Sequence, residues 1–216
     1  MMDSVFFTPT VQLVNLTEDA EQLLVSMAKV SSSNTTNNVK LLKYLIKHKH
    51  WSPFEMITMT VMITTTRDIS RQIIRHRSFS FQEFSQRYQK IGQIQEDPCI
   101  RECRTQDYKN RQNSIPSDDT DLNKSWEDIQ KDVWSSCIKA YNKCLELKIA
   151  KEQARCLLPE GLTKTQMYMT GSLRSWMHYA DLRGGNGTQR EHMLIATQIK
   201  KIFKDKLPTC ASAMNF

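Results

Sequence analysis

The feature that most constrains the fold is a change of hydrophobic period near Thr66. In residues 57–64, apolar side chains alternate with threonines and a methionine, which is the pattern of a strand with one buried face. After Thr66, Ile69 and Ile73 lie four residues apart, the spacing of one helical face. The chain is therefore predicted to form a strand that runs directly into a helix.

The predicted helix carries a second stripe of cationic side chains, Arg67, Arg71 and Arg75, together with Gln72. Like charges at this spacing repel one another by about a few tenths of a kcal/mol when they are exposed. An anionic ligand or an acidic partner would relieve this repulsion. The alternative is a solvated basic face that binds nothing.

Further helices are predicted where apolar residues recur at helical spacing after a capping residue. They begin after Thr17, near Leu41, after Ser125, after Ser172 and after a Thr188–Glu191 capping box. In the helix after Ser125, the expected core positions are Ile129, Val133, Cys137, Tyr141 and Cys144. A shorter helical piece is expected to end at Leu158, before Pro159.

A second strand is predicted over residues 163–170, ended by Gly171. Residues 31–38 are expected to form a polar turn, and residues 105–124 a mobile surface loop. The Ser52-Pro53 pair is expected to break the second helix, which closes near His50. We expect one α+β domain, residues 1–216, in which a small and largely antiparallel sheet is flanked by helices.

The charge of the chain limits its partners. A formal net charge of +7 and a pI of about 9.1 attract anions, so nucleic acid, nucleotides and phosphate-bearing cofactors all remain possible. No apolar run approaches the length of about 20 residues that spans a bilayer, and we expect no membrane insertion.

Cysteine usage indicates a reducing compartment. Six cysteines are spread along a chain without a recognisable signal peptide, so a cytoplasmic location is expected. Cys99 and Cys103 lack a second pair at zinc-ligand spacing, and no metal site is expected. Pro98-Cys99 resembles part of the Pro-Cys-His motif of the classical thymidylate synthases, which use the cysteine as nucleophile, but Ile100 replaces the histidine and nothing around it matches, so an ordinary thiol is favoured.

The most informative stretch is residues 75–88, Arg-His-Arg-Ser-Phe-Ser-Phe-Gln-Glu-Phe-Ser-Gln-Arg-Tyr. Arginine presents a planar set of donors that matches phosphate and pyrimidine carbonyls. Hydroxyls can complete a phosphate site, and a carboxylate can orient a base or a ribose. This combination is typical of a nucleotide-binding segment.

The same stretch carries a family resemblance. Arg75-His76-Arg77, followed by seven residues and then Ser85, closely resembles the signature of flavin-dependent thymidylate synthases. The similarity extends to Arg87-Tyr88 and to segments elsewhere in the chain. These are His50-Trp51-Ser52-Pro53-Phe54-Glu55, Ala154-Arg155, Leu158-Pro159 and Leu173-Arg174-Ser175.

The resemblance implies roles for the matching positions. The positions similar to dUMP contacts are Gln72, Arg75, Glu83, Ser85, Gln86, Arg87, Arg155 and Arg183. The positions similar to flavin contacts are His50, Arg75, His76, Arg77, Glu83, Arg174 and His178. Arg75, Arg183 and His50 are the implied catalytic residues. Two positions depart from the family pattern, because Gln82 replaces a frequent Asn and Gly171 replaces a side-chain amide of some members.

The implied reaction transfers the methylene group of methylenetetrahydrofolate to C5 of dUMP. Reduced FAD would deliver the hydride, and NADPH would restore the flavin. Ser85 is interpreted as a ligand rather than a nucleophile, because the sequence places no general base beside it. The resemblance also implies a homotetramer whose active sites are shared between subunits.

Two other functions remain open at this stage. A basic nucleic-acid-binding protein would explain the charge and the arginine stripe but not the ordered match elsewhere in the chain, so no nucleic-acid partner is expected. A flavin-binding relative without synthase activity would explain the motif. The Gly184–Gly187 turn is not interpreted as a dinucleotide fingerprint, because no strand leads into it at the required spacing.

Overall fold

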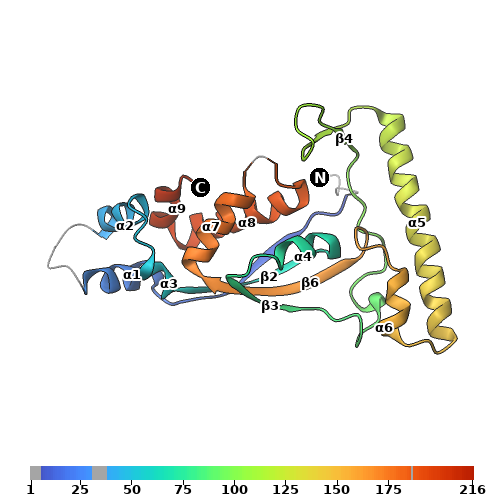
Figure 1. The fold of residues 1–216 in the computed structure, drawn as a ribbon, viewed down its shortest axis with the longest axis horizontal. Helices are drawn as coiled ribbons and strands as arrows, with labels where there is room; N and C mark the ends of the chain where they lie inside the picture. The colour runs from blue at the N-terminus through green and yellow to red at the C-terminus, as the bar shows by residue number, and fades with distance from the viewer. Residues whose placement is uncertain (1–5, 31–37, 186) are drawn as a thin grey trace.

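The computed structural model describes residues 6–30, 38–185 and 187–216. Its centre is a four-stranded antiparallel sheet with the strand order β1-β2-β6-β3 (Figure 1). The strands are β1 (Thr10–Leu16), β2 (Thr58–Thr66), β6 (Lys164–Ser172) and β3 (Phe79–Glu83). The expected α+β class and the largely antiparallel sheet are therefore confirmed.

The two central strands are the two that the sequence predicts. In β2, Met59, Val61 and Ile63 are fully buried while the intervening residues are partly exposed, as the alternating pattern requires. Gly171 does not end β6, although the sequence pattern predicts that it does. It lies within the strand, opposite Phe79 of β3, and the aromatic ring occupies the space that a side chain would need.

The two outer strands were not predicted. β1 carries no fully buried side chain, so its apolar pattern is weak, and it pairs with β2 through an irregular register between Leu13 and Asn15. β3 lies inside residues 75–88, the stretch that the sequence predicts as a nucleotide-binding segment. Phe79 and Phe81 alternate there with polar residues, which is also the pattern of a strand.

Three helices precede and connect the first strands, α1 (Ala20–Lys29), α2 (Asn38–Lys47) and α3 (Ser52–Glu55). The predicted cap at Thr17 is wrong, because α1 begins after Asp19 and the Thr17 hydroxyl instead accepts a hydrogen bond from the Thr58 amide at 3.0 Å. Pro53 follows the end of α2 and occupies the first turn of α3. Of the polar turn expected at residues 31–38, residues 31–37 lie outside the described part of the chain.

Helix α4 (Arg67–Ile73) follows β2 without a linker, as predicted, and buries Ile69 and Ile73. Arg75 lies beyond its last turn, so the expected stripe of three arginines consists of only Arg67 and Arg71.

The segment expected as a mobile loop contains a hairpin, β4 (Arg104–Gln106) paired with β5 (Ser114–Pro116). It leads into α5 (Thr120–Glu146), which stands apart from the sheet on the right of Figure 1. The expected cap at Ser125 is wrong. Asp119 caps the helix by accepting from the amides of Asp121 and Leu122, each at 3.0 Å.

The apolar stripe of α5 is only partly core. Tyr141 is buried as expected, together with Trp134, and they pack with Ile91 of the 3-10 helix η1 (Ile91–Gln93). Ile129 and Val133 are 55% and 43% exposed, which corrects their assignment to the core. Cys137 and Cys144 lie between these extremes, at intermediate exposure.

The chain then continues through α6 (Lys151–Ala154) and the 3-10 helix η2 (Arg155–Leu157), the expected short helical piece. After β6 come α7 (Leu173–Arg183), α8 (Arg190–Lys206) and α9 (Pro208–Met214). Ser172 caps α7 as predicted, by accepting from the Ser175 amide at 3.3 Å.

The predicted Thr188–Glu191 capping box is wrong, because Gln189 is the N-cap residue of α8, and α9 rather than α8 is the last helix. The Gly184–Gly187 turn is described except for residue 186, and Gly187 has a φ of 92°, which suits glycine.

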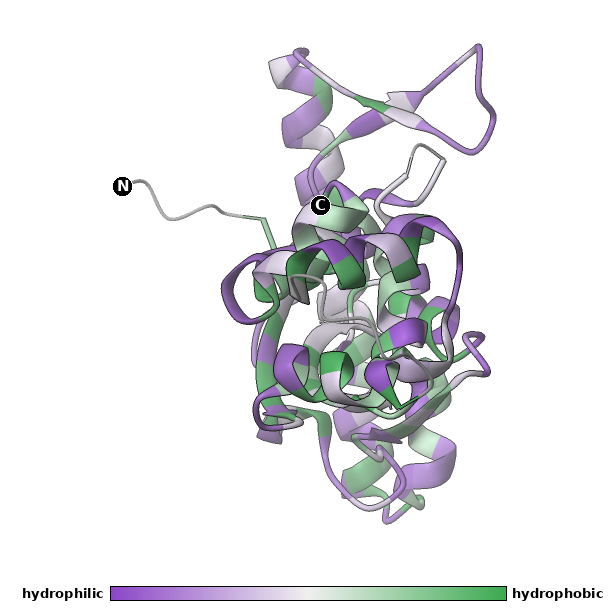
Figure 2. Cartoon of the chain, turned by 90° about the vertical axis from the view of Figure 1, so that its left-hand side faces the viewer, coloured by the Kyte–Doolittle hydropathy of each residue, from purple (hydrophilic) through white to green (hydrophobic). Residues whose placement is uncertain are grey.

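The main hydrophobic core is formed by buried side chains of the sheet and of helices α1, α2, α3, α4, α7, α8 and α9. Figure 2 shows the hydrophobic segments turned toward the middle of the molecule, whereas the β4–β5 hairpin at the top is mostly hydrophilic. Among the described residues, no helix combines the length and the apolar character needed to cross a membrane.

Candidate active site

A basic pocket lies beside α4, at the end of the sheet near α6. Its volume is about 340 Å³. It is lined by Arg67, Arg71, Gln86, Glu152, Arg155, Cys156, Leu158 and Glu160. Gln86 and Arg155 are predicted site residues, so the pocket joins two parts of the family motif that are distant in sequence.

The pairing of β3 with β6 brings the motif to this pocket. Glu83 lies opposite Met167, and the Phe84 amide donates to the Gln166 carbonyl at 2.8 Å, which carries the chain past the edge of α4. A turn follows in which the Ser85 carbonyl accepts from the amides of Tyr88 and Gln89. This turn directs Gln86 inward, where it is 4% exposed.

Glu83 is an acidic partner of both arginines on α4, and Arg71 also donates to Glu160 at 3.2 Å. The Glu83 carboxylate lies 3.5 Å from Arg67 and 3.9 Å from Arg71, and it accepts hydrogen bonds from Ser70 and Thr165, each at 2.9 Å. Burial lowers the pKa of the Arg67 guanidinium, and the charge of Glu83 opposes that effect. Arg67 is 7% exposed, so the alternative of a fully solvated basic face does not hold for it.

The pocket retains donors that nothing in the described chain satisfies. Gln86 Nε2 is buried and has no hydrogen-bond acceptor among the described residues, whereas the buried Arg67 Nη1 has the ion pair with Glu83 at 3.5 Å but no hydrogen bond there. Arg155 has no carboxylate within ion-pair distance in that same part of the chain, whereas Arg87 is held at the rim by Glu152 at 3.2 Å. Buried donors without acceptors are costly, and an anionic or carbonyl-bearing ligand would satisfy them.

A second group of predicted residues lies on the other side of α4, where Gln72 faces α7 and α8. His76 Nε2 accepts a hydrogen bond from Arg183 Nε at 2.9 Å, so His76 is neutral and carries its proton on Nδ1. Burial and the nearby Arg183 lower the pKa of His76 to about 4. Gln72 contacts the fully buried His192, which in turn contacts the Tyr179 hydroxyl.

A third group lies where α3 meets α7. Arg174 donates to Glu55 at 2.6 Å, Ser172 donates to the same carboxylate at 2.5 Å, and these bonds hold the pKa of Glu55 below its usual value. The ring of His178 packs edge-on against Trp51, with 4.9 Å between centroids.

Within one chain, the predicted site residues therefore lie in three separate groups. Glu83, Gln86, Arg87 and Arg155 meet at the basic pocket, with Ser85 in the adjoining turn, and Gln72, His76 and Arg183 meet behind α4. Arg75 and Arg77 are exposed on the turn after α4, and His50 is exposed beside His48 and Tyr44.

Sequence reasoning missed Tyr179, His192, Glu55 and Arg67 as members of these groups. Glu55 and Arg67 lay within or next to quoted motifs, so their charge was an available signal. Tyr179 and His192 had no local signal, because a buried aromatic residue and a buried histidine are also common in ordinary cores.

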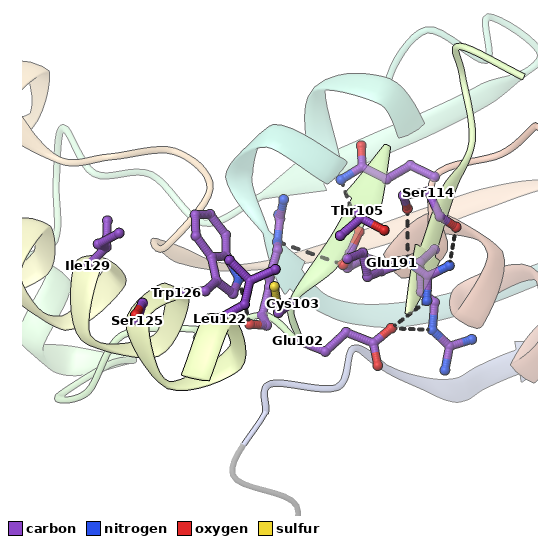
Figure 3. Close-up of a pocket in the computed structure, with 13 residues that line it drawn as sticks. Glu102, Cys103, Thr105, Ser114, Leu122, Ser125, Trp126, Ile129 and Glu191 are labelled. Carbon is purple, nitrogen blue, oxygen red and sulfur yellow. Dashed lines mark hydrogen bonds and ion pairs between the residues drawn. The ribbon is translucent and has the colours of Figure 1, made fainter. Parts of the chain in front are cut away.

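A larger cavity, of about 450 Å³, contains none of the predicted site residues. It lies between the β4–β5 hairpin and the first turns of α5 and α8, with Trp126 and Ile129 on one side and Glu191 on the other (Figure 3). Glu102 pairs with Arg104 at 2.9 Å and with Arg190 at 2.8 Å, so these two arginines are already neutralised. Arg101 also lines this cavity, and its buried Nε has no hydrogen bond among the described residues, although it lies 3.9 Å from the Glu191 carboxylate.

Two other candidate chemistries gain no support. Cys99 is buried, and burial raises the pKa of its thiol to about 12, so it is not a thiolate at neutral pH. Within residues 6–30, 38–185 and 187–216, no three His, Cys, Asp or Glu side chains are placed to hold a metal ion.

The family comparison identifies the class to which this fold and site belong. The sequence model described as "Thymidylate synthase complementing protein", Thy1, matches residues 12–209, which defines the chain as an enzyme of the thymidylate synthase class. A probable flavin-dependent thymidylate synthase of Paramecium bursaria Chlorella virus 1 is 45% identical over 212 residues, covering 96% of this chain and 95% of the relative. The flavin-dependent thymidylate synthase of a Synechocystis strain is 46% identical over 198 residues, covering 91% and 90%. The chain belongs to the flavin-dependent thymidylate synthase family.

A solved structure extends this agreement to the fold. The crystal structure of a UMP/dUMP methylase, PolB from Streptomyces cacaoi, bound with 5-Br UMP, superimposes with a TM-score of 0.85 at 26% sequence identity. The match covers 97% of this chain and 95% of that one.

Proposed function

We propose that this flavin-dependent thymidylate synthase converts dUMP to dTMP, with methylenetetrahydrofolate as carbon donor, FAD as hydride carrier and NADPH as reductant. Residues 1–216 act as one catalytic domain. The observation that carries the assignment of substrate is the basic pocket, where the buried Gln86 amide nitrogen has no acceptor among the described residues and Arg155 has no carboxylate partner among them. A nucleotide phosphate or a pyrimidine carbonyl supplies the acceptors that these groups lack.

The basic pocket holds dUMP in this proposal. Arg87 and Arg155 bind the phosphate or the carbonyls, and Gln86 donates its buried amide. Ser85 adds a hydroxyl from the turn, and Glu83 fixes the arginines of α4 in place through its four contacts. Gln72, Arg75 and Arg183 lie away from this pocket within one chain, so in this proposal they complete the contacts to the base from a neighbouring subunit.

The flavin site is proposed at His50, Arg75, His76, Arg77, Glu83, Arg174 and His178. The donor set fits such a group, since its exposed arginines and its imidazoles, of which His50 and His178 are exposed, can meet phosphate oxygens and ring nitrogens. When bound, the flavin supplies the hydride, which no side chain of the chain can supply. The protein orients the uracil ring, and its guanidinium groups stabilise negative charge that develops on the carbonyl oxygens.

Assembly into a homotetramer completes the site. Two observations support this proposal: the predicted residues of one chain lie in three groups rather than one cavity, and large apolar side chains such as Leu122, Ile129 and Val133 are exposed along α5. Contiguous exposed apolar residues are typical of surfaces that contact another protein.

The test combines colour, turnover and mass. The purified protein is expected to absorb at about 450 nm, as oxidised flavins do, and to form dTMP only when methylenetetrahydrofolate and NADPH are both present. Light scattering on a sizing column should give four times the 25.2 kDa of one chain. A colourless protein that binds nucleic acid but forms no dTMP would overturn the assignment and favour the alternative that the charge left open.

A further inference from the structure

A chain of hydrogen bonds runs through the interior from Glu191 to Tyr179 and passes through Gln72. The Gln189 amide nitrogen donates to Glu191 at 2.9 Å, and the Gln72 amide nitrogen donates to Gln189 Oε1 at 2.7 Å. Gln72 Oε1 lies 3.2 Å from His192 Nδ1, and His192 Nε2 lies 2.9 Å from the Tyr179 hydroxyl. Its two ends are therefore a carboxylate and a phenol.

The carboxylate at one end decides the direction of every bond. An ionised carboxylate can only accept, so Gln189 must turn its NH2 group toward Glu191 and its carbonyl toward Gln72. Gln72 must then present its NH2 group to Gln189 and its carbonyl to His192. Rotating either amide by half a turn would place two acceptors face to face.

The same logic fixes the proton of His192. Its Nδ1 faces a carbonyl oxygen and must carry hydrogen, and burial lowers the pKa of the ring to about 3, so the ring is neutral. Nε2 is then an acceptor, and the Tyr179 hydroxyl donates to it. Both residues are 1% exposed or less, so solvent offers no alternative partner.

The chain of hydrogen bonds uses one N–H of the Gln72 amide nitrogen and one lone pair of its carbonyl oxygen. The second N–H and the second lone pair take no part in this chain of hydrogen bonds. Because the Gln72 amide cannot rotate, these two groups point in fixed directions. We propose that Glu191, through Gln189 and with His192 and Tyr179 behind it, is a positioning residue that holds the Gln72 amide in the one orientation that pairs with the uracil of dUMP. This inference rests on the proposed function, which makes Gln72 a contact to the nucleotide.

The outer end of the chain lies in the larger cavity, where Glu191 faces Arg101 at 3.9 Å (Figure 3). Arg101 is itself held by Asp68 at 2.7 Å. Glu102 lies in the same cavity and pairs with Arg104 and Arg190, but it does not touch the chain. It offers a matched control of the same chemistry.

The experiment measures the Kd of dUMP by calorimetry on the flavin-loaded enzyme for E191Q, Q72A and the E191Q/Q72A double variant. E191Q replaces a pure acceptor by an amide, which removes the direction without changing the shape. We expect E191Q to raise the Kd about 10-fold, the effect of one misdirected buried hydrogen bond. In the Q72A background, E191Q should change the Kd of dUMP by less than about 2-fold, because Glu191 acts only through Gln72.

Y179F serves as the second variant, since it removes only the hydroxyl at the far end. It should weaken dUMP binding less than E191Q, and its effect should also vanish in the Q72A background. The flavin content of every variant and the dUMP affinity of E102Q should match the wild type. These readouts separate positioning from a general loss of structure.

The outcomes are distinct. A wild-type protein that binds no dUMP would overturn the proposed function and this inference together. If the wild type binds dUMP but E191Q binds it equally well, or if E191Q costs as much with Q72A as without it, only the positioning role is overturned. A Q72A variant with wild-type affinity would also reject the positioning role and leave the enzyme assignment intact.

Discussion

The ring of Phe79 lies against the backbone of Gly171 on the neighbouring strand, so close that a β-carbon at Gly171 would stand 2.5 Å from the ring. The contact joins β3 to the core, because Phe79 also packs edge-on against Trp176 of α7 with 4.7 Å between centroids. Glycine at this position is therefore a requirement of packing, not of backbone conformation.

Gly171→Ala should destabilise the fold. The added methyl group forces the Phe79 ring away from Trp176, and overpacking of this kind costs about 1–3 kcal/mol. Urea unfolding followed by tryptophan fluorescence measures the change. Gly92→Ala is the control, since no atom lies within 4 Å of a β-carbon built there, and equal stability losses in both variants would contradict the packing argument.

Arg155→Ala should weaken dUMP binding. Its guanidinium borders the basic pocket, and leaving a buried phosphate or carbonyl unpaired costs about 2–5 kcal/mol. The expected result is a large rise in KM for dUMP with unchanged flavin absorbance. Arg111→Ala removes an exposed arginine from the β4–β5 loop and controls for net charge; an equal effect there would mean that only the overall charge matters.

Stability should fall as the pH drops below about 6.5. His76 and His192 have pKa values of about 4 and about 3 in the folded protein, against 6.5 without the protein environment. The unfolded chain binds protons at these histidines first, so stability is fully present above about pH 6.5 and is lost progressively toward the folded values. Urea midpoints at about pH 7 and about pH 5.5 measure this slope.

His192→Gln should flatten that slope, because one of the two depressed histidines is removed. A wild-type midpoint that stays constant over the same interval would show that both histidines are protonated as readily in the folded chain as in the unfolded one.

Ser85→Ala should retain measurable turnover with weaker dUMP binding. In the described residues, no histidine or carboxylate lies within hydrogen-bond distance of Ser85 Oγ to act as a base. Single-turnover assays with saturating dUMP separate binding from chemistry. Complete loss of chemistry with dUMP affinity preserved would instead identify Ser85 as a nucleophile.

The sequence predicted the parts of the fold whose pattern is local. The central strands and the helix after Thr66 follow from periods of two and of about 3.6 residues, because each buries one whole face. β1 escaped detection because none of its residues is fully buried. Ile129 and Val133 were misassigned because helical spacing shows that an apolar stripe exists but does not show what covers it.

The candidate site likewise has one part that the sequence predicts and another part that it does not. Residues 75–88 are contiguous, so their chemistry could be recognised from the sequence alone. The contact between Gln72 and His192 joins positions 120 residues apart, and only the packing of α4 against α8 brings them together. The cap of α5 was mispredicted because Asp119 and Ser125 are both good capping residues, and the strand before the helix decides between them.

Helix α4 has only seven residues, just under two turns, yet it serves both sides of the site. Arg71 faces the basic pocket, and the adjacent Gln72 faces the buried chain of hydrogen bonds. Neighbouring residues on a helix differ in direction by about 100°. Inserting or deleting a single residue between Thr66 and Arg71 would rotate both side chains out of their places at once. The length of this helix is therefore fixed by the two partners that it must meet.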